Sequence, residues 1–247
     1  ENLPRPDVVL ITHEHGDHFL GLDDLLCFRR ASPVDDWQPI PVFATAKSWE
    51  QIESRFGYLL GSLLEKHIAE PGEPLEGACF GPGLQCLPIK TDHGPMPQGA
   101  VGYRFEISQD GRSLRIGYTS DMVGLSDPDG FSGLDLLVCQ SHFLNEPKLN
   151  RANHLSLQRA LDFWQRWRPG RLYLVHLSCQ DFIPGDEPAN RMLKKYEPAG
   201  ALCAPDGEPY PIPRDQASWQ EVVERILGDR GLSIPVQVAW DGLKVRL

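Results

Sequence analysis

The stretch that most constrains this chain is the polar segment Thr12-His13-Glu14-His15-Gly16-Asp17-His18. It places three histidines and an aspartate within six residues, directly after the apolar run 8–11, which is typical of a buried strand. His13 and His15 are two residues apart, so both side chains point the same way from extended backbone. A glycine then lets the chain turn, so that Asp17 and His18 face a second point nearby. Imidazole and carboxylate groups suit zinc-like or manganese-like cations, and one loop can therefore serve two metals.

Histidine or aspartate recurs downstream near the ends of predicted strands. The strands are expected at 84–89, 114–118, 134–139 and 172–175, and the polar residues that follow them are His93, Asp121, His142 and His176. Residues just beyond the carboxyl ends of strands line a common crevice in layered folds. We therefore expect these side chains to converge with the first polar segment on one edge.

The remaining segments mix strands with amphipathic helices. Further strands are expected at 41–44 and 101–107, and helices at 19–28, from 48 to about 66, and at 157–167. A capping box over 218–221 predicts a helix that ends at Gly228, and alternation around Asp241-Gly242 predicts a C-terminal hairpin over 236–247. Residues 180–216 hold seven prolines and predict an irregular excursion around a short helix near 189–196. This mixture indicates an α+β protein with two sheets face to face and helices outside.

Composition limits the classes of protein that fit. The chain has 247 residues, 41% hydrophobic and 23% charged, which is typical of a globular protein, and we expect one domain over 1–247. No apolar stretch approaches the roughly 18–20 residues needed to cross a bilayer, so we expect no membrane partner. A net charge of −10 argues against non-specific polynucleotide binding. The six cysteines include no close-spaced pair, which favours reduced thiols and a cytoplasmic protein.

The pattern His-x-His-x-Asp-His, followed in order by a histidine, an aspartate and a histidine, resembles the metallo-β-lactamase superfamily. The resemblance implies a four-layer αββα sandwich with a dinuclear metal site between its sheets. It assigns His13, His15 and His93 to one metal, Asp17, His18 and His176 to the other, and Asp121 to a bridge between them. Zinc or manganese is expected, with iron as a further choice. Many lactam-hydrolysing members carry a cysteine at the position of Asp121, which argues against lactamase activity. Members usually have several strands before the first metal-binding strand, and we expect this chain to lack them.

Three further stretches look like the PhnP-type phosphodiesterases, which are relatives of tRNase Z. They are Gly21–Leu25, Asn153–Ser156 and Ala239–Leu243. The resemblance implies that a metal-bound hydroxide cleaves a small, in some members cyclic, phosphodiester. His154 is then the acid that protonates the leaving oxygen, a role that suits an imidazole with a pKa near 6.5, and Asp17 is expected to serve catalysis as well as metal binding. His142 receives no family role, and we expect it to support the ligands or the fold.

Other functions stay open at the level of sequence. A tRNase Z-like nuclease is one alternative, although nucleic acid is the less expected partner of a chain this acidic. A thioester or lactone hydrolase is a second, and a non-catalytic metal-binding accessory protein is a third. The expected partner is a small phosphodiester substrate, and a homodimer is a further possibility at the level of sequence.

Overall fold

The computed structural model describes residues 4–33, 36–178, 180–181, 185 and 196–246, and its strands form two sheets. The smaller sheet joins three parallel strands in the order β1 (Val9–Leu10), β2 (Ile40–Ala44) and β3 (Leu64–Ile68). The larger sheet contains β4 (Leu84–Asp92), β5 (Val101–Gln109), β6 (Arg112–Tyr118), β7 (Gly124–Leu125), β8 (Leu136–Gln140), β9 (Leu172–Val175) and β10 (Val236–Val238). Its seven strands run in the order β10-β9-β8-β6-β5-β4-β7.

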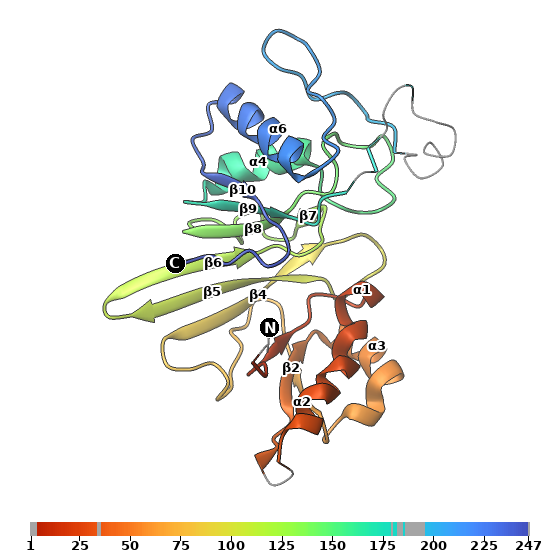
Figure 1. Cartoon of the computed structure of the whole chain (residues 1–247), viewed down its shortest axis with the longest axis vertical. Helices are drawn as coiled ribbons and strands as arrows, with labels where there is room; N and C mark the ends of the chain where they lie inside the picture. Colours follow the sequence, from red (N-terminus) through yellow and green to blue (C-terminus); the bar gives the residue numbers. More distant parts are fainter. Residues whose placement is uncertain (1–3, 34–35, 179, 182–184, 186–195, 247) are drawn as a thin grey trace.

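Helices cover the outer side of each sheet, which gives the four layers that were predicted (Figure 1). The helices α4 (Leu157–Trp167) and α6 (Gln216–Asp229) lie over β8, β9 and β10. Around β2 lie α1 (Gly16–Phe19), the 3-10 helix Leu20–Leu25, α2 (Leu26–Ala31), α3 (Ala46–Phe56) and the 3-10 helix Gly57–Leu59. The expected helix over 19–28 is thus two short α-helices with a 3-10 segment between them.

The core between the two sheets fixes the position of the first polar segment. Tyr103 on β5 is buried, and its hydroxyl donates a 2.7 Å hydrogen bond to the carbonyl of Ile11. The backbone N–H of Val101 donates to the carbonyl of Thr12 at 2.9 Å, and that of Ile11 donates to the carbonyl of Phe43. Because both sheets hold the chain just before His13, the histidine loop starts from a rigid point.

Helix α4 begins and ends where the sequence predicts, because its start is capped and one face is apolar. The Ser156 hydroxyl accepts a hydrogen bond from the backbone N–H of Arg159 at 3.1 Å. Leu157, Leu161 and Trp164 are buried against the large sheet. Each such side chain contributes about 1.5–3 kcal/mol on burial, so this helix is firmly attached beside His154.

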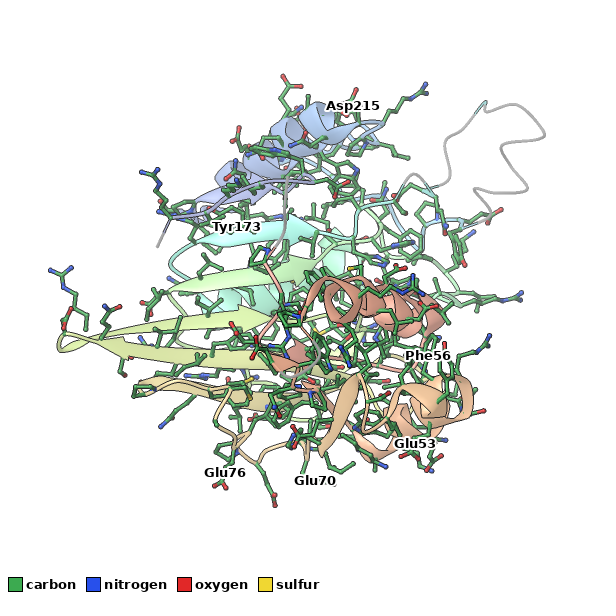
Figure 2. All side chains as sticks on the ribbon, turned by 60° about the horizontal axis from the view of Figure 1, so that its bottom comes forward. Glu53, Phe56, Glu70, Glu76, Tyr173 and Asp215 are labelled. Carbon is green, nitrogen blue, oxygen red and sulfur yellow. The ribbon has the colours of Figure 1, made fainter. Side chains whose placement is uncertain are left out.

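Three predicted elements are wrong in detail. Residues 64–66 belong to β3 and not to a helix, since Leu64 pairs with Ile40 in a parallel ladder. Ser218 was predicted to be the N-cap of α6, but the N-cap is Asp215, which Figure 2 labels. Ser218 is the third residue of the helix and forms the second half of the capping box. No C-terminal hairpin forms within the described residues, because β10 pairs in parallel with β9 and Leu243 instead lines an apolar cavity of about 300 Å³.

Some predictions concern parts that the structure does not test or describe. The short helix expected near 189–196 lies outside the described residues, apart from Tyr196. Across the described segments, none of the helices combines the length and apolar character needed to span a membrane.

Candidate metal centre

The predicted ligands meet at one edge of the sandwich because each follows the end of a strand. The histidine loop follows β1, His93 follows β4, and Asp121 lies three residues after β6. His142 and His176 follow β8 and β9, which run parallel to each other and to β6. All seven predicted ligands fall into groups whose ligand atoms lie within 4.8 Å of one another.

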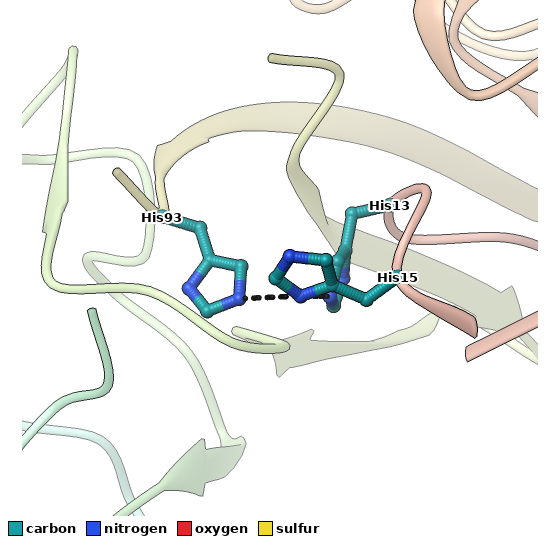
Figure 3. A group of neighbouring side chains, drawn as sticks. All are labelled: His13, His15 and His93. Carbon is teal, nitrogen blue, oxygen red and sulfur yellow. Dashed lines mark hydrogen bonds between the residues drawn. The ribbon is translucent and has the colours of Figure 1, made fainter. Parts of the chain in front are cut away.

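The first group consists of three imidazoles that point toward one position (Figure 3). The Nε2 atoms of His13 and His93 each lie 3.2 Å from Nδ1 of His15. A tetrahedral ion with metal–nitrogen bonds of about 2.0–2.1 Å separates neighbouring ligand atoms by roughly 3.3 Å. Burial lowers the pKa of His13 to about 2 and also lowers the pKa of His93, so both rings are neutral and keep a lone pair for a cation.

The second group combines an exposed carboxylate with two imidazoles. Asp17 Oδ2 lies 3.7 Å from Nε2 of His18. One ligand atom of each of these side chains lies within 4.8 Å of a ring nitrogen of His176. The Asp17 side chain is 73% exposed, whereas that of His13 is fully buried. The second group therefore forms the open side of the centre, from which a substrate and solvent have access.

Asp121 lies between the two groups. Its Oδ2 atom is buried and has no hydrogen-bond partner in the described structure. Four Nε2 atoms surround this oxygen, those of His18 at 3.2 Å, His176 at 3.4 Å, His93 at 3.9 Å and His13 at 4.0 Å. Burial opposes ionisation of Asp121, but the neighbouring imidazoles, first His18 and then His176, outweigh it and hold the pKa below its usual range. A buried, charged oxygen without a hydrogen-bond partner is costly, so this donor set fits divalent cations bound on both sides of it.

Hydrogen bonds to the far ring nitrogens orient the ligand imidazoles. His93 Nδ1 lies 2.7 Å from the carbonyl of Asn153, and since a carbonyl only accepts, the ring donates there and leaves Nε2 bare. The Thr12 hydroxyl lies 3.1 Å from Nδ1 of His13 and 3.3 Å from Nδ1 of His18. Its oxygen can accept from both rings, which again leaves both Nε2 atoms free for metal.

His154 lies next to the Asp121 carboxylate, and its ring is stacked on that of His142. Nδ1 of His154 is 3.6 Å from Asp121 Oδ2, and its ring stacks on that of His142 with centroids 4.3 Å apart. Burial, followed by the charge of His142, lowers the pKa of His154 to about 3, so the expected pKa near 6.5 is wrong for the metal-free protein. Burial first and His176 second lower the pKa of His142 to about 4. His142 Nδ1 lies 3.1 Å from Nδ1 of His176, so His142 contacts a predicted ligand.

Unusual backbone conformations occur at three positions of the centre. Ser120 precedes Asp121 and has φ of 56°, Asn153 precedes His154 with φ of 54°, and His176 itself has φ of 58°. A left-handed conformation costs a residue other than glycine roughly 1–2 kcal/mol. Such local strain at the ends of the elements is typical of functional sites, where the surrounding structure holds side chains in required directions.

Two residues of the centre had no signal in the sequence analysis. The Glu14 carboxylate accepts hydrogen bonds from the backbone N–H groups of Gln98 at 2.7 Å and Gly99 at 3.1 Å, and from the Ser48 hydroxyl at 3.1 Å. It therefore ties the segment after His93 to the histidine loop.

Gln140 lies 2.9 Å from Asp121 and 2.6 Å from His154. A lone glutamine at the end of a strand has no characteristic spacing, so only the folded geometry reveals it.

Comparisons with known proteins agree with this geometry. Residues 1–177 match the family model of the Beta-lactamase superfamily domain. Ribonuclease BN of Escherichia coli O17:K52:H18 is 26% identical over 249 residues, which cover 82% of this chain and 80% of that protein. The fold is similar to a diphosphatase of the PhnP family, with a TM-score of 0.59, 21% identity and coverage of 98% and 71% of the two chains. It is also similar to Zn²⁺-bound PqqB from Methylobacterium extorquens, with a TM-score of 0.61, 17% identity and coverage of 97% and 73%.

Proposed function

Since this chain belongs to the β-lactamase superfamily, we propose that it is a dinuclear metal-dependent hydrolase that cleaves phosphodiesters with His154 as the acid. The match of residues 1–177 to the family model confirms the resemblance to this superfamily that was inferred from the sequence. The donor set supports divalent metals, and the two histidine groups with Asp121 between them support a pair of ions. Ions bound there supply an activated water and neutralise negative charge on a phosphate.

The side chains of the chain then have separate tasks. His13, His15 and His93 hold the buried ion, and Asp17, His18 and His176 hold the exposed one, whose open side admits the diester. Asp121 keeps both positions at a fixed separation because its Oδ1 is anchored by Gln140 while its Oδ2 faces the imidazoles. These tasks follow from positions and burial, and they need no movement of the sheets.

The observation that carries the proposal is the placement of His154. It lies 3.6 Å from Asp121 Oδ2 and comes within ligand distance of His93 and Asp121 and of His142 and His176, yet it is not one of the seven predicted ligands. A hydrolase that releases a thiolate has less need of an added proton donor, because a thiolate leaves readily. An alkoxide leaves a phosphodiester poorly, so a positioned donor at this place favours a phosphodiester substrate.

A ribonuclease is the second candidate function, and a specific observation favours it. The similarity to ribonuclease BN covers 82% of the chain. The net charge of −10 weighs against it, because nucleic-acid binding rests largely on cationic contacts with phosphates. We therefore place a small phosphodiester first and an RNA phosphodiester second, with the same chemistry at the metal centre.

The substitution His154→Ala tests the proposal with two diesters that differ in leaving group. Turnover of a diester with a poor alkoxide leaving group should fall by roughly 10²–10⁴, the usual contribution of a positioned acid. A diester that releases a nitrophenolate needs less protonation and should lose much less. Zinc-loaded protein should be measured on both, and on a structured RNA, a thioester and a lactone.

The matched control is His67→Ala, which removes a half-buried imidazole that stacks on Phe43 away from the ligand groups. It should leave the ratio of the two diester rates unchanged. Equal losses on both diesters, or loss of a metal ion in His154→Ala, would mean that His154 acts by packing or by coordination. Turnover of the thioester or lactone without turnover of any diester would refute the phosphodiesterase assignment.

A further inference from the structure

Gln140, the last residue of β8, contacts both the bridging carboxylate and His154, although it is neither a ligand nor a residue that touches substrate in the proposed function. It is almost fully buried. Its side-chain amide ends in one oxygen, which only accepts hydrogen bonds, and one nitrogen, which carries two hydrogens and only donates. The direction of this amide therefore determines which hydrogen-bond roles its neighbours must take.

Two backbone groups fix that direction. The N–H of Met122 lies 2.9 Å from Gln140 Oε1, and the N–H of Leu155 lies 3.2 Å from the same oxygen. Rotating the amide by half a turn would set its NH₂ group against two buried backbone N–H groups, which would leave buried donors unpaired. The Nε2 atom must therefore face the metal centre.

Both hydrogens of that nitrogen then have acceptors. Asp121 Oδ1 lies 2.9 Å away and His154 Nδ1 lies 2.6 Å away, whereas His176 Nδ1 is more distant at 3.4 Å. A donor at 2.6 Å requires His154 Nδ1 to be an unprotonated acceptor. The ring proton of neutral imidazole can then only be on Nε2.

We propose that Gln140 is a positioning residue that holds His154 in the neutral tautomer with its proton on Nε2, which makes His154 a hydrogen donor and excludes it as a metal ligand through that nitrogen. This proposal rests on the proposed function and gives it a mechanism for the acid. Because Nδ1 is taken by Gln140, Nε2 is the ring nitrogen left to donate to a departing oxygen.

The hydrogen-bond partners of a ligand histidine have the opposite polarity. His93 Nδ1 faces the carbonyl of Asn153, so His93 must carry its proton on Nδ1 and keep Nε2 bare for a metal. His154 Nδ1 faces an amide donor, so His154 carries its proton on Nε2. The rings of His93 and His154 have centroids only 5.1 Å apart, yet the partner of Nδ1 gives each ring a different role.

With its proton on Nε2, His154 can donate a hydrogen bond to a departing oxygen as negative charge develops there. A neutral histidine that polarises oxygen in this way is an established catalytic device.

The direct test is nitrogen NMR of the whole protein labelled with ¹⁵N-histidine, metal-free and zinc-loaded, with the His154 signal assigned through His154→Gln. Near neutral pH the Nε2–H form of His154 should exceed the Nδ1–H form by about tenfold or more, since the alternative leaves two buried donors facing each other. Detection of a proton on Nδ1 as the main form, in either state, would overturn the proposal.

The substitution Gln140→Glu supplies a second measurement. A carboxylate keeps the acceptor for Met122 and Leu155 but turns the other atom into an acceptor, so His154 should gain a proton on Nδ1. The matched control is Gln158→Glu, because Gln158 Oε1 also accepts a backbone N–H, that of Glu146 at 2.9 Å, without a histidine partner. The control should leave the His154 tautomer unchanged, and an unchanged tautomer in Gln140→Glu would refute the positioning role.

The two proposals fail in different ways. If His154 has the Nε2–H form but His154→Ala loses both diester activities equally, the acid assignment is wrong and the role of Gln140 as a tautomer lock stands. If the leaving-group difference is found but His154 carries its proton on Nδ1, the phosphodiesterase assignment stands and the role of Gln140 is wrong. The NMR measurement needs no substrate, so a failure to find the natural substrate does not affect it.

Discussion

Glu14 provides a sharp test of how the metal centre is supported. It lies between the predicted ligands His13 and His15, but its carboxylate points away from them to the segment that follows His93. The substitution Glu14→Gln keeps the size of the side chain and one carbonyl oxygen. It removes the negative charge and replaces one acceptor oxygen with an NH₂ group, which cannot accept.

The expected loss follows from the contacts. Hydrogen bonds to a charged group contribute about 1.5–3 kcal/mol, and neutral ones about 0.5–1.5 kcal/mol. Glu14 Oε1 accepts from the N–H of Gln98 at 2.7 Å and of Gly99 at 3.1 Å, so both bonds weaken, by about 1 kcal/mol each. The second oxygen accepts from Ser48 at 3.1 Å and from buried Gly99 at 3.2 Å, and its loss adds about 1–2 kcal/mol. We expect the free energy of unfolding to fall by about 3–4 kcal/mol.

Urea unfolding of the metal-free protein measures this difference, and a competition titration with a zinc chelator measures the effect on the metal. Outer contacts of this kind typically change metal affinity by about 10–100-fold, and the site formed by His13, His15 and His93 should weaken accordingly. The matched control is Glu50→Gln, whose side chain is 59% exposed and pairs with Lys47, so its effect should stay below about 1 kcal/mol. A Glu14→Gln protein within about 0.5 kcal/mol of the parent and with unchanged zinc affinity would refute the reasoning.

Further outcomes are expected for metal content and pH. Elemental analysis and zinc titration should reach two divalent ions per chain, and Asp121→Ala should weaken or abolish at least one of them; full retention of both would contradict the bridge. Burial lowers the pKa values of His13, His154 and His142 to about 2, 3 and 4, whereas these rings titrate near 6.5 when unfolded. Between these values the unfolded chain binds more protons, so the metal-free protein should lose roughly 1 kcal/mol per pH unit for each histidine as the pH falls below 6.5. Urea unfolding at pH 7.5, 6.5 and 5.5 checks this, and a constant free energy would contradict it.

The clustering of the predicted ligands could be foreseen because it depends on local order along the chain. His13, His15, Asp17 and His18 share one turn after an apolar strand, and the strand that carries His93 is marked by its own apolar residues. Support for the ligands is non-local, since the bond from Gln98 to Glu14 joins residues 84 positions apart. Neither periodicity nor spacing in a single sequence indicates such a long-range pairing. The sequence therefore offers no reason to distinguish Glu14 from other acidic residues of the loop.

Element types failed where an apolar pattern fits two structures. Leu59, Leu60 and Leu63 continue the spacing of α3, yet the chain turns at Gly61 and Leu64 opens β3 beside β2. Pairing with β2 makes this segment a strand, because each of the five residues of β3 has a partner residue on β2. Likewise, alternation near the C-terminus shows that one face is apolar but not what covers it, and Leu243 packs toward the large sheet without joining a hairpin.

The roles of the clustered histidines show why a residue list and a mechanism differ. Imidazoles within a few ångströms of Asp121 Oδ2 are equivalent as chemical groups, and any of them could bind metal by proximity alone. What separates them is the partner of Nδ1, which is a carbonyl for His93 and an amide donor for His154. Because a neutral ring carries one proton on one of its two nitrogens, the partner of Nδ1 decides whether Nε2 offers a lone pair or a hydrogen. Backbone amides at Met122 and Leu155 set this choice through Gln140, so the fold around the strand ends, and not the histidine itself, determines the chemistry at that position.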